Sequence, residues 1–87
     1  MRRIVITIGY VGSNYGGWQV QPNRDTVQAR VEAALLALTG VQTSVVASGR
    51  TDAGVHALGQ VAHFDTPVSI PAKNFVRGLN RFLPPDI

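Results

Sequence analysis

The segment SGRTDAGVHALG, residues 48–59, places an arginine and an aspartate one residue apart in a glycine-rich stretch. In extended backbone, side chains at positions i and i+2 project from the same side, so Arg50 and Asp52 would lie together. A neighbouring guanidinium favours the charged form of a carboxyl group. An ionised carboxylate on a loop can act as a nucleophile or a general base. The motif therefore makes Asp52 a candidate catalytic group, with Arg50 placed to contact a phosphate or to fill the space left by a displaced base.

The same spacing also fits a purely structural turn. Asp52 could cap the turn that leads to Gly54 through an Asx-type hydrogen bond, with Arg50 as its ion-pair partner. Gly49, Gly54 and Gly59 would allow positive φ and the close approach of another backbone or a ligand. Spacing alone leaves both interpretations open.

Metal and phosphate-loop chemistry find little support in the sequence. Asp52, His56, His63 and Asp65 match no standard ligand spacing, so histidines on a surface or strand face are the better interpretation. The chain has no cysteine, which excludes disulfides and thiolate metal sites. SGRTDAG lacks the Gly-Lys-Ser/Thr ending of a phosphate-binding loop. The residues alone therefore favour no metal site, and the phosphate-loop signal is weak.

A second unusual segment, GYVGSNYGGWQVQ, holds aromatic and amide side chains among glycines: Tyr10, Tyr15, Trp18, Gln19 and Gln21. Aromatic and amide groups in loops can stack on RNA bases and bind their edges. Trp18 can equally fold back as a lid on a small core, and for this residue the lid is the preferred interpretation.

The charge of the chain agrees with a nucleic-acid partner without requiring one. The net charge is +3, and seven of the eight basic residues are arginines, the exception being Lys73. The planar guanidinium suits phosphates and stacks on bases. An ordinary solvated basic surface would have the same composition.

The first half of the chain predicts a strand, a helix and a second strand. Isoleucines alternate over residues 3–10, as in a half-buried strand. A helix is expected to begin after Asp25 or Thr26, with Asp25 and Gln28 resembling a capping box, and to end at Gly40. Residues 43–48 are expected to form the next strand.

The second half predicts a strand over 60–66, which ends at Pro67, and a helix that begins near Pro71 and ends before Pro84–Pro85. The apolar stripe of this helix is expected to face the core, and it comprises Ala72, Phe75, Val76, Leu79, Phe82 and Leu83. The order β-α-β-β-α predicts an α+β, ferredoxin-like half-domain. It has an antiparallel sheet with two helices on one face, and its final strand is missing.

Eighty-seven residues make one domain, and its abrupt end after the second helix indicates a fragment of a longer chain. The two arginines before the first apolar run resemble a signal peptide. That run is short, however, and no small-residue cleavage site follows it. No apolar run approaches the ~18 residues needed to span a bilayer. With no cysteine either, we expect a cytoplasmic protein.

One long segment of the sequence resembles the signature of a known protein family. GRTDAGVHALGQVAHFDT, residues 49–66, closely resembles the signature of the TruA family of tRNA pseudouridine synthases. Three further segments agree with that family in order and spacing, so the resemblance covers nearly the whole chain: GYVGSNYGGWQ at 9–19, TVQARVEAAL at 26–35 and LNRFLPPDI at 79–87.

The resemblance implies isomerisation of uridine to pseudouridine in tRNA, in the anticodon stem-loop region, without metal or organic cofactor. The family's catalytic aspartate falls on Asp52, and the arginine associated with base flipping falls on Arg50. The rest of the matching motif, which would support the loop, comprises Gly49, Thr51, Gly54 and His56. Family members form homodimers and are considerably longer, with a second half that completes the cleft. Residues 1–87 would be the N-terminal subdomain, and we expect them to be inactive alone.

The sequence departs from the family pattern at one position, and it also leaves two alternative functions to consider. The family's first loop usually reads Tyr-Asp-Gly, whereas this chain has Tyr10-Val11-Gly12. The main alternative is a non-catalytic RNA-binding module with a ferredoxin-like sheet, although the expected strands are mostly aliphatic and Phe64 is the main aromatic exception. A structural or dimerisation domain would leave the Arg-Thr-Asp motif unexplained.

Overall fold

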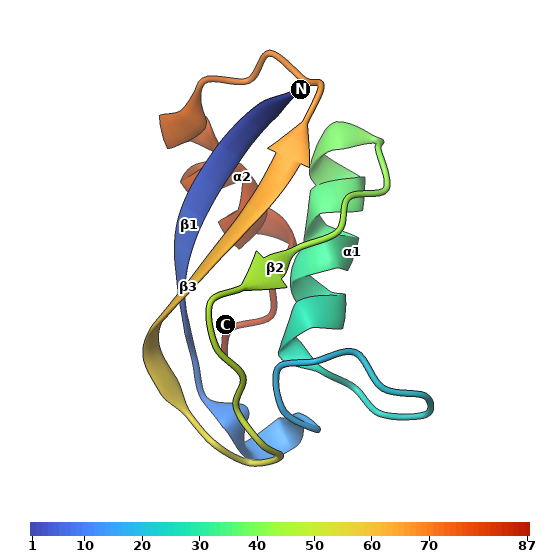
Figure 1. The fold of residues 1–87 in the computed structure, drawn as a ribbon, viewed down its shortest axis with the longest axis vertical. Helices are drawn as coiled ribbons and strands as arrows, with labels where there is room; N and C mark the ends of the chain where they lie inside the picture. The colour runs from blue at the N-terminus through green and yellow to red at the C-terminus, as the bar shows by residue number, and fades with distance from the viewer.

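The computed structural model describes residues 1–87 and shows two helices packed on a short sheet (Figure 1). The elements follow the predicted β-α-β-β-α order, with one additional 3-10 turn, η1. Their bounds are β1 (Arg2–Tyr10), η1 (Gly12–Asn14), α1 (Val27–Thr39), β2 (Val46–Ala47), β3 (Ala57–Thr66) and α2 (Ala72–Phe82).

The sheet has the order β1-β3-β2, and both pairs are antiparallel. Because β3 inserts between β1 and β2, the two strands that flank α1 are not neighbours, as in a split βαβ unit. The outer edge of β1 has no strand partner. This arrangement confirms the predicted α+β, ferredoxin-like half-domain.

One face of the sheet forms the core with both helices. Ile4 is opposite Phe64 and Ile6 is opposite Ala62 in the β1–β3 register, so these side chains share that face. The ring of Phe64 meets the ring of Phe75 from α2 edge-on, with centroids 5.3 Å apart. Edge-to-face pairs of this kind add about 0.5–1.5 kcal/mol to the burial of their area.

Helix α1 begins and ends where its sequence predicts. The side chain of Thr26 accepts a hydrogen bond from the Ala29 amide at 3.3 Å and caps the first turn. Gly40 has φ of +74° and its amide donates to the Leu36 carbonyl, which closes the last turn.

The expected capping box is wrong. Asp25 instead binds the guanidinium of Arg30, with 2.6 Å between the nearest atoms. The Gln28 amide group reaches across to the carbonyl of Val45, at 2.8 Å. Gln28 therefore ties α1 to the segment before β2, and Thr26 alone caps the helix.

Strand β2 is shorter than the expected 43–48 and covers only Val46–Ala47. The amide of Val45 donates to the carboxylate of Glu32 instead of to a strand neighbour. The hydroxyl of Thr43 donates to the Val41 carbonyl, which makes a local turn. Side-chain hydrogen bonds of this kind compete with strand pairing and delay its start.

Strand β3 begins at Ala57, three residues earlier than expected. The register shifts between Ile8 and Tyr10, where β3 carries an extra residue opposite β1. Bulges of this kind bend a strand and are common beside functional sites. The connection between β2 and β3 is therefore a tighter loop, residues 48–56.

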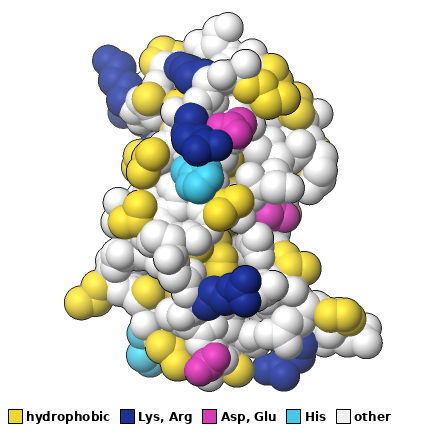
Figure 2. All heavy atoms as spheres, in the orientation of Figure 1, with side chains coloured by type: hydrophobic (Ala, Val, Ile, Leu, Met, Phe, Trp, Pro, Cys, Tyr) yellow, Lys and Arg dark blue, Asp and Glu magenta, His cyan; other side chains and the backbone are white.

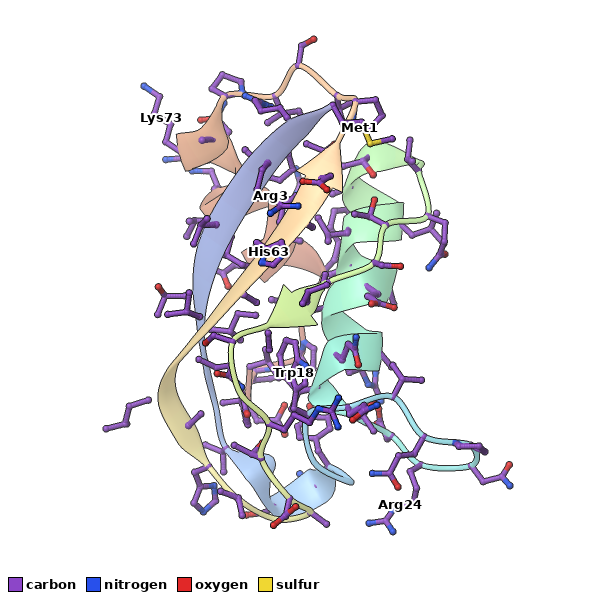
Figure 3. The ribbon with its side chains drawn as sticks, viewed as in Figure 1. Met1, Arg3, Trp18, Arg24, His63 and Lys73 are labelled. Atoms are coloured by element: carbon purple, nitrogen blue, oxygen red, sulfur yellow. The ribbon has the colours of Figure 1, made fainter.

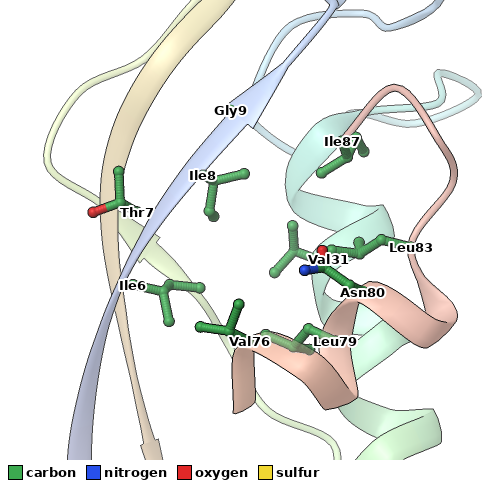
Figure 4. Close-up of a pocket in the computed structure, with 10 residues that line it drawn as sticks. All are labelled: Ile6, Thr7, Ile8, Gly9, Val31, Val76, Leu79, Asn80, Leu83 and Ile87. Atoms are coloured by element: carbon green, nitrogen blue, oxygen red, sulfur yellow. The ribbon is translucent and has the colours of Figure 1, made fainter. Parts of the chain in front are cut away.

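The apolar stripe of α2 is only partly buried, which corrects the expectation that all of it faces the core. Phe75 and Leu79 are buried, but Val76 and Phe82 are 60% and 46% exposed. Val76 borders the side of β1 that has no strand partner, where no further strand covers the helix. An apolar hollow remains between β1 and α2, lined by side chains such as Ile6, Val76 and Leu83 (Figure 4).

Neither helix combines the length and the apolar character that crossing a bilayer requires.

Candidate active site

The loop before Asp52 is fixed by the end of β1 and the loop that follows it. The hydroxyl groups of Tyr10 and Thr51 lie 2.7 Å apart. The backbone amide of Trp18 donates to the Thr51 carbonyl at 3.1 Å. Thr51 is therefore held through both its side chain and its backbone, immediately before the candidate nucleophile.

The chain turns sharply after Asp52. The amide of Val55 donates to the Asp52 carbonyl at 3.1 Å, which closes a four-residue turn. Gly54 has φ of +79° within this turn, and its amide donates to the Tyr15 carbonyl. Of the three glycines that could adopt positive φ in this segment, only Gly54 does so; Gly49 and Gly59 are not among the residues with that conformation.

His56 connects the end of the loop to η1. Its Nδ1 atom accepts a hydrogen bond from the Gly12 amide at 2.8 Å. This contact fixes the imidazole as an acceptor at Nδ1, a geometry that a metal ion at the same atom would break. His63 lies farther along β3, and no group of three or more acidic or histidine side chains is arranged to hold a metal.

The last residues of the chain support the same loops. The hydroxyl of Tyr15 donates to the Asp86 carboxylate at 2.5 Å, and the Val11 amide donates to the Asp86 carbonyl at 2.8 Å. Burial, followed by the Asp86 contact, raises the pKa of Tyr15 to about 12. The hydrogen bond from Tyr15 lowers the pKa of the Asp86 carboxyl below its usual value. The side chain of Val11, where the family usually has an acid, is exposed.

Asp52 itself is exposed, and no hydrogen bond or ion pair engages its carboxylate. The Asx-type capping interpretation is therefore wrong. The expected Arg50–Asp52 ion pair is also absent, because the two ion pairs of the structure are Arg3–Asp65 and Arg30–Asp25.

Arg50 and Asp52 nevertheless line one polar hollow of about 280 Å³. Its full lining is Gly16, Gln19, Gln21, Arg24, Arg50, Thr51, Asp52 and Ala53. Figure 2 shows basic and acidic groups close together at the lower end of the molecule, where the loops of Figure 1 meet. The apolar hollow beside α2 contains no titratable side chain. The polar hollow is therefore the candidate active site.

The aromatic residues of the first loop are part of the core. Tyr10, Tyr15 and Trp18 are all buried, and the rings of Tyr10 and Trp18 lie 6.4 Å apart. Figure 3 shows Trp18 inside the fold. Stacking of these rings on RNA bases is thus excluded in this structure, and the interpretation of Trp18 as a lid on the core is confirmed.

Two residues that contribute to the site could not be predicted from the motif alone. Arg24 lines the hollow although 27 residues separate it from Asp52 in the sequence. Tyr10 holds Thr51 from the end of β1. The residues Pro22 and Asn23 indicate a turn before Arg24. The local sequence does not indicate that this turn lies beside the loop that contains Asp52.

Comparison with known proteins identifies the family to which this chain belongs. A family model described as tRNA pseudouridine synthase matches residues 6–87. The chain belongs to this family. Three similar proteins, all called tRNA pseudouridine synthase A, come from Pelobacter propionicus, Geobacter sulfurreducens and Exiguobacterium, with 58%, 55% and 53% identity over 87 residues. Each match covers 100% of this chain and 35–36% of the relative, so the chain spans about a third of their length.

Proposed function

We propose that the full-length protein containing this sequence isomerises uridine to pseudouridine in tRNA, with Asp52 as the nucleophile. The observation that carries the proposal is the free, exposed carboxylate of Asp52 in a polar hollow that it shares with Arg50. The hydrogen bonds to Thr51, Gly54 and His56 fix the loop around that carboxylate. The loop is thus ordered while the reactive group stays available. Membership of the family and the names of the relatives support the same reaction.

The reaction needs little more than such a group. An oxygen of Asp52 attacks C1′ of the ribose while the bond from C1′ to N1 of the uracil breaks. The detached uracil turns, and its C5 bonds to C1′ and displaces the carboxylate. A proton leaves C5 and another reaches N1, so no atom is gained or lost and Asp52 is regenerated.

Arg50 supports the proposal as the group that stabilises the extruded nucleotide. Moving a stacked base out of its helix costs a few kcal/mol. A guanidinium at the mouth of the hollow can occupy the vacated space or bind a phosphate of the extruded nucleotide. Arg50 is exposed and makes no ion pair, so its guanidinium is available for either role.

A non-catalytic RNA-binding module gains no specific support. Modules with this sheet architecture stack bases on aromatic side chains of their central strands. The open face of this sheet carries Val5 opposite His63 and Thr7 opposite Val61, while Phe64 is buried on the other face. The open face therefore lacks an aromatic stacking platform.

Tritium release from tRNA labelled at C5 of uridine tests the proposal, because the C5 proton leaves during the reaction. We expect the full-length protein to release tritium from tRNA, with the label lost from the anticodon arm. Binding of tRNA without release would support the binding module instead. The proposal also includes a cytoplasmic homodimer, and light scattering of the full-length protein measures its oligomeric state.

A further inference from the structure

Arg24 reaches the candidate active site through a tight turn. Gln21, Pro22, Asn23 and Arg24 form this turn, with the Arg24 amide 3.4 Å from the Gln21 carbonyl. Asn23 has φ of +60° after a proline, a combination that type II turns favour. Figure 3 shows Arg24 at the lower end of the molecule, on the loop that leads into α1.

The turn is anchored on Gly16, which fixes where Arg24 lies. The side-chain amide of Gln21 donates to the Gly16 carbonyl at 2.9 Å, and the Gly16 amide donates to the Asp25 carbonyl at 2.7 Å. A Cβ atom at position 16 would lie 2.9 Å from Nε and 3.1 Å from Cβ of Arg24. Arg24 therefore rests on Gly16, and any larger residue there would displace it.

The guanidinium of Arg24 has no protein partner. Arg3 and Arg30 form ion pairs and Arg2 donates to the backbone carbonyls of Val68 and Ile70, whereas Arg50, Arg77 and Arg81 also lack a side-chain partner. Of these arginines without a partner, only Arg24 and Arg50 line the polar hollow. Arg24 makes no side-chain hydrogen bond, although it lines the same hollow as Asp52. An unpaired guanidinium on an ordered turn beside a reactive carboxylate is suited to an anionic group of the substrate.

We propose that Arg24 binds a phosphodiester adjacent to the target uridine and so positions the ribose C1′ over Asp52. The inference rests on the proposed function and deepens it by assigning a substrate contact to the site. Phosphate contacts set the position and orientation of a nucleic acid on a protein. If Arg24 binds the RNA backbone, Arg50 is free to occupy the space that the extruded base leaves.

The test combines a charge-removing variant with a charge-removing change in the RNA. Arg24→Gln is prepared in the full-length protein, and its binding to tRNA is measured with the native backbone and with a neutral methylphosphonate on either side of the target uridine. On native tRNA we expect about tenfold weaker binding, and a logarithmic salt slope about 0.7–0.9 shallower. On the RNA that lacks the contacted charge, Arg24→Gln should change binding less than about twofold.

Two further variants separate position from charge. Gly16→Ala keeps the arginine but displaces it, so we expect about threefold slower tritium release under subsaturating tRNA with an unchanged salt slope. Arg77→Gln removes an exposed arginine of α2 that does not line the hollow, and it should leave binding to all three RNAs within about twofold of wild type.

The inference is overturned if Arg24→Gln matches Arg77→Gln, or if it weakens binding equally on all three RNAs. A wild-type protein that binds tRNA but releases no tritium would contradict the proposed function instead. Failure of the phosphate contact and failure of the enzymatic reaction are thus distinguishable.

Discussion

The hydroxyl oxygens of Tyr10 and Thr51 lie 2.7 Å apart, and this contact joins the end of β1 to the residue before Asp52. Tyr10 is buried and its ring lies near that of Trp18, so the contact connects the loop with the core. The position of the proposed nucleophile thus depends on a contact made by the residue before it.

Thr51→Val tests this dependence. The change keeps the shape of the side chain but removes the hydroxyl, so we expect a loss of about 1 kcal/mol in the free energy of unfolding. A small displacement of Asp52 should lower kcat about tenfold while KM changes little. Thr7→Val, on the exposed face of β1, is the matched control and should alter neither quantity. A double-mutant cycle with Tyr10→Phe should show coupling, and purely additive effects would argue against the contact.

Gly54→Ala and Gly49→Ala differ in one backbone angle. Gly54 has φ of +79°, which costs an alanine about 1–2 kcal/mol. Gly49 does not have positive φ, and an added Cβ would come no closer than 3.8 Å to the Gln60 side chain. We therefore expect Gly54→Ala to lower both melting temperature and kcat, while Gly49→Ala stays close to wild type. Equal effects of the two variants would show that the left-handed turn is unimportant.

Arg50→Ala is expected to impair extrusion of the uridine. The variant should lower kcat/KM on tRNA at least about tenfold. Unstacking the uridine costs a few kcal/mol, and the variant lacks the arginine contact that offsets this cost. Abasic sites on both sides of the target uridine remove its stacking, so the defect should shrink on that substrate. Arg77→Ala serves as the charge-matched control. A defect of the same size on both substrates would assign Arg50 a role other than base extrusion.

The contact between Tyr15 and Asp86 predicts a particular pH dependence. The pKa of the Asp86 carboxyl is lowered in the folded state, so its stabilising contribution is present above its unfolded value and is lost as the pH falls through the folded one. The pKa of Tyr15 is raised to about 12, so its contribution is present below the ordinary tyrosine value of about 10 and is lost as the pH rises toward 12.

Melting curves recorded between pH 2 and 6 measure how the melting temperature falls as the carboxyl groups become protonated. Tyr15→Phe removes the main cause of the lowered Asp86 pKa, so the melting temperature of this variant should fall less steeply with acid than that of wild type. Tyr10→Phe removes a hydroxyl that contacts a neutral partner and should keep the wild-type slope. Parallel acid limbs for wild type and Tyr15→Phe would contradict the prediction.

Local signals predicted the order of the elements and both ends of α1, but not the start of β2. Thr26 and Gly40 mark the ends of α1 because capping and left-handed termination depend on a few neighbouring residues. The start of β2 depends on Glu32 and Gln28, which reach from α1 to the backbone of Val45. These contacts join residues 17 and 13 positions apart in the sequence, so local patterns could not reveal them.

The site shows the same division between local and tertiary information. The motif alone indicated Arg50 and Asp52, which indeed line one hollow. The expected ion pair between them is absent, because two side chains that line one hollow need not lie within contact distance of each other. Arg24 enters the hollow from a distant turn, and its placement on Gly16 is a tertiary contact that no spacing rule predicts.

The rate of tritium release by Asp52→Asn in the full-length protein tests the central claim most directly. The change keeps the size of the side chain and removes its nucleophilic charge. The proposed mechanism predicts a loss of at least about a thousandfold in kcat, with tRNA affinity within about threefold of wild type. Asp65→Asn, which alters only an exposed ion pair, should retain wild-type turnover. Turnover by Asp52→Asn close to that of Asp65→Asn would contradict the assignment of Asp52 as the nucleophile.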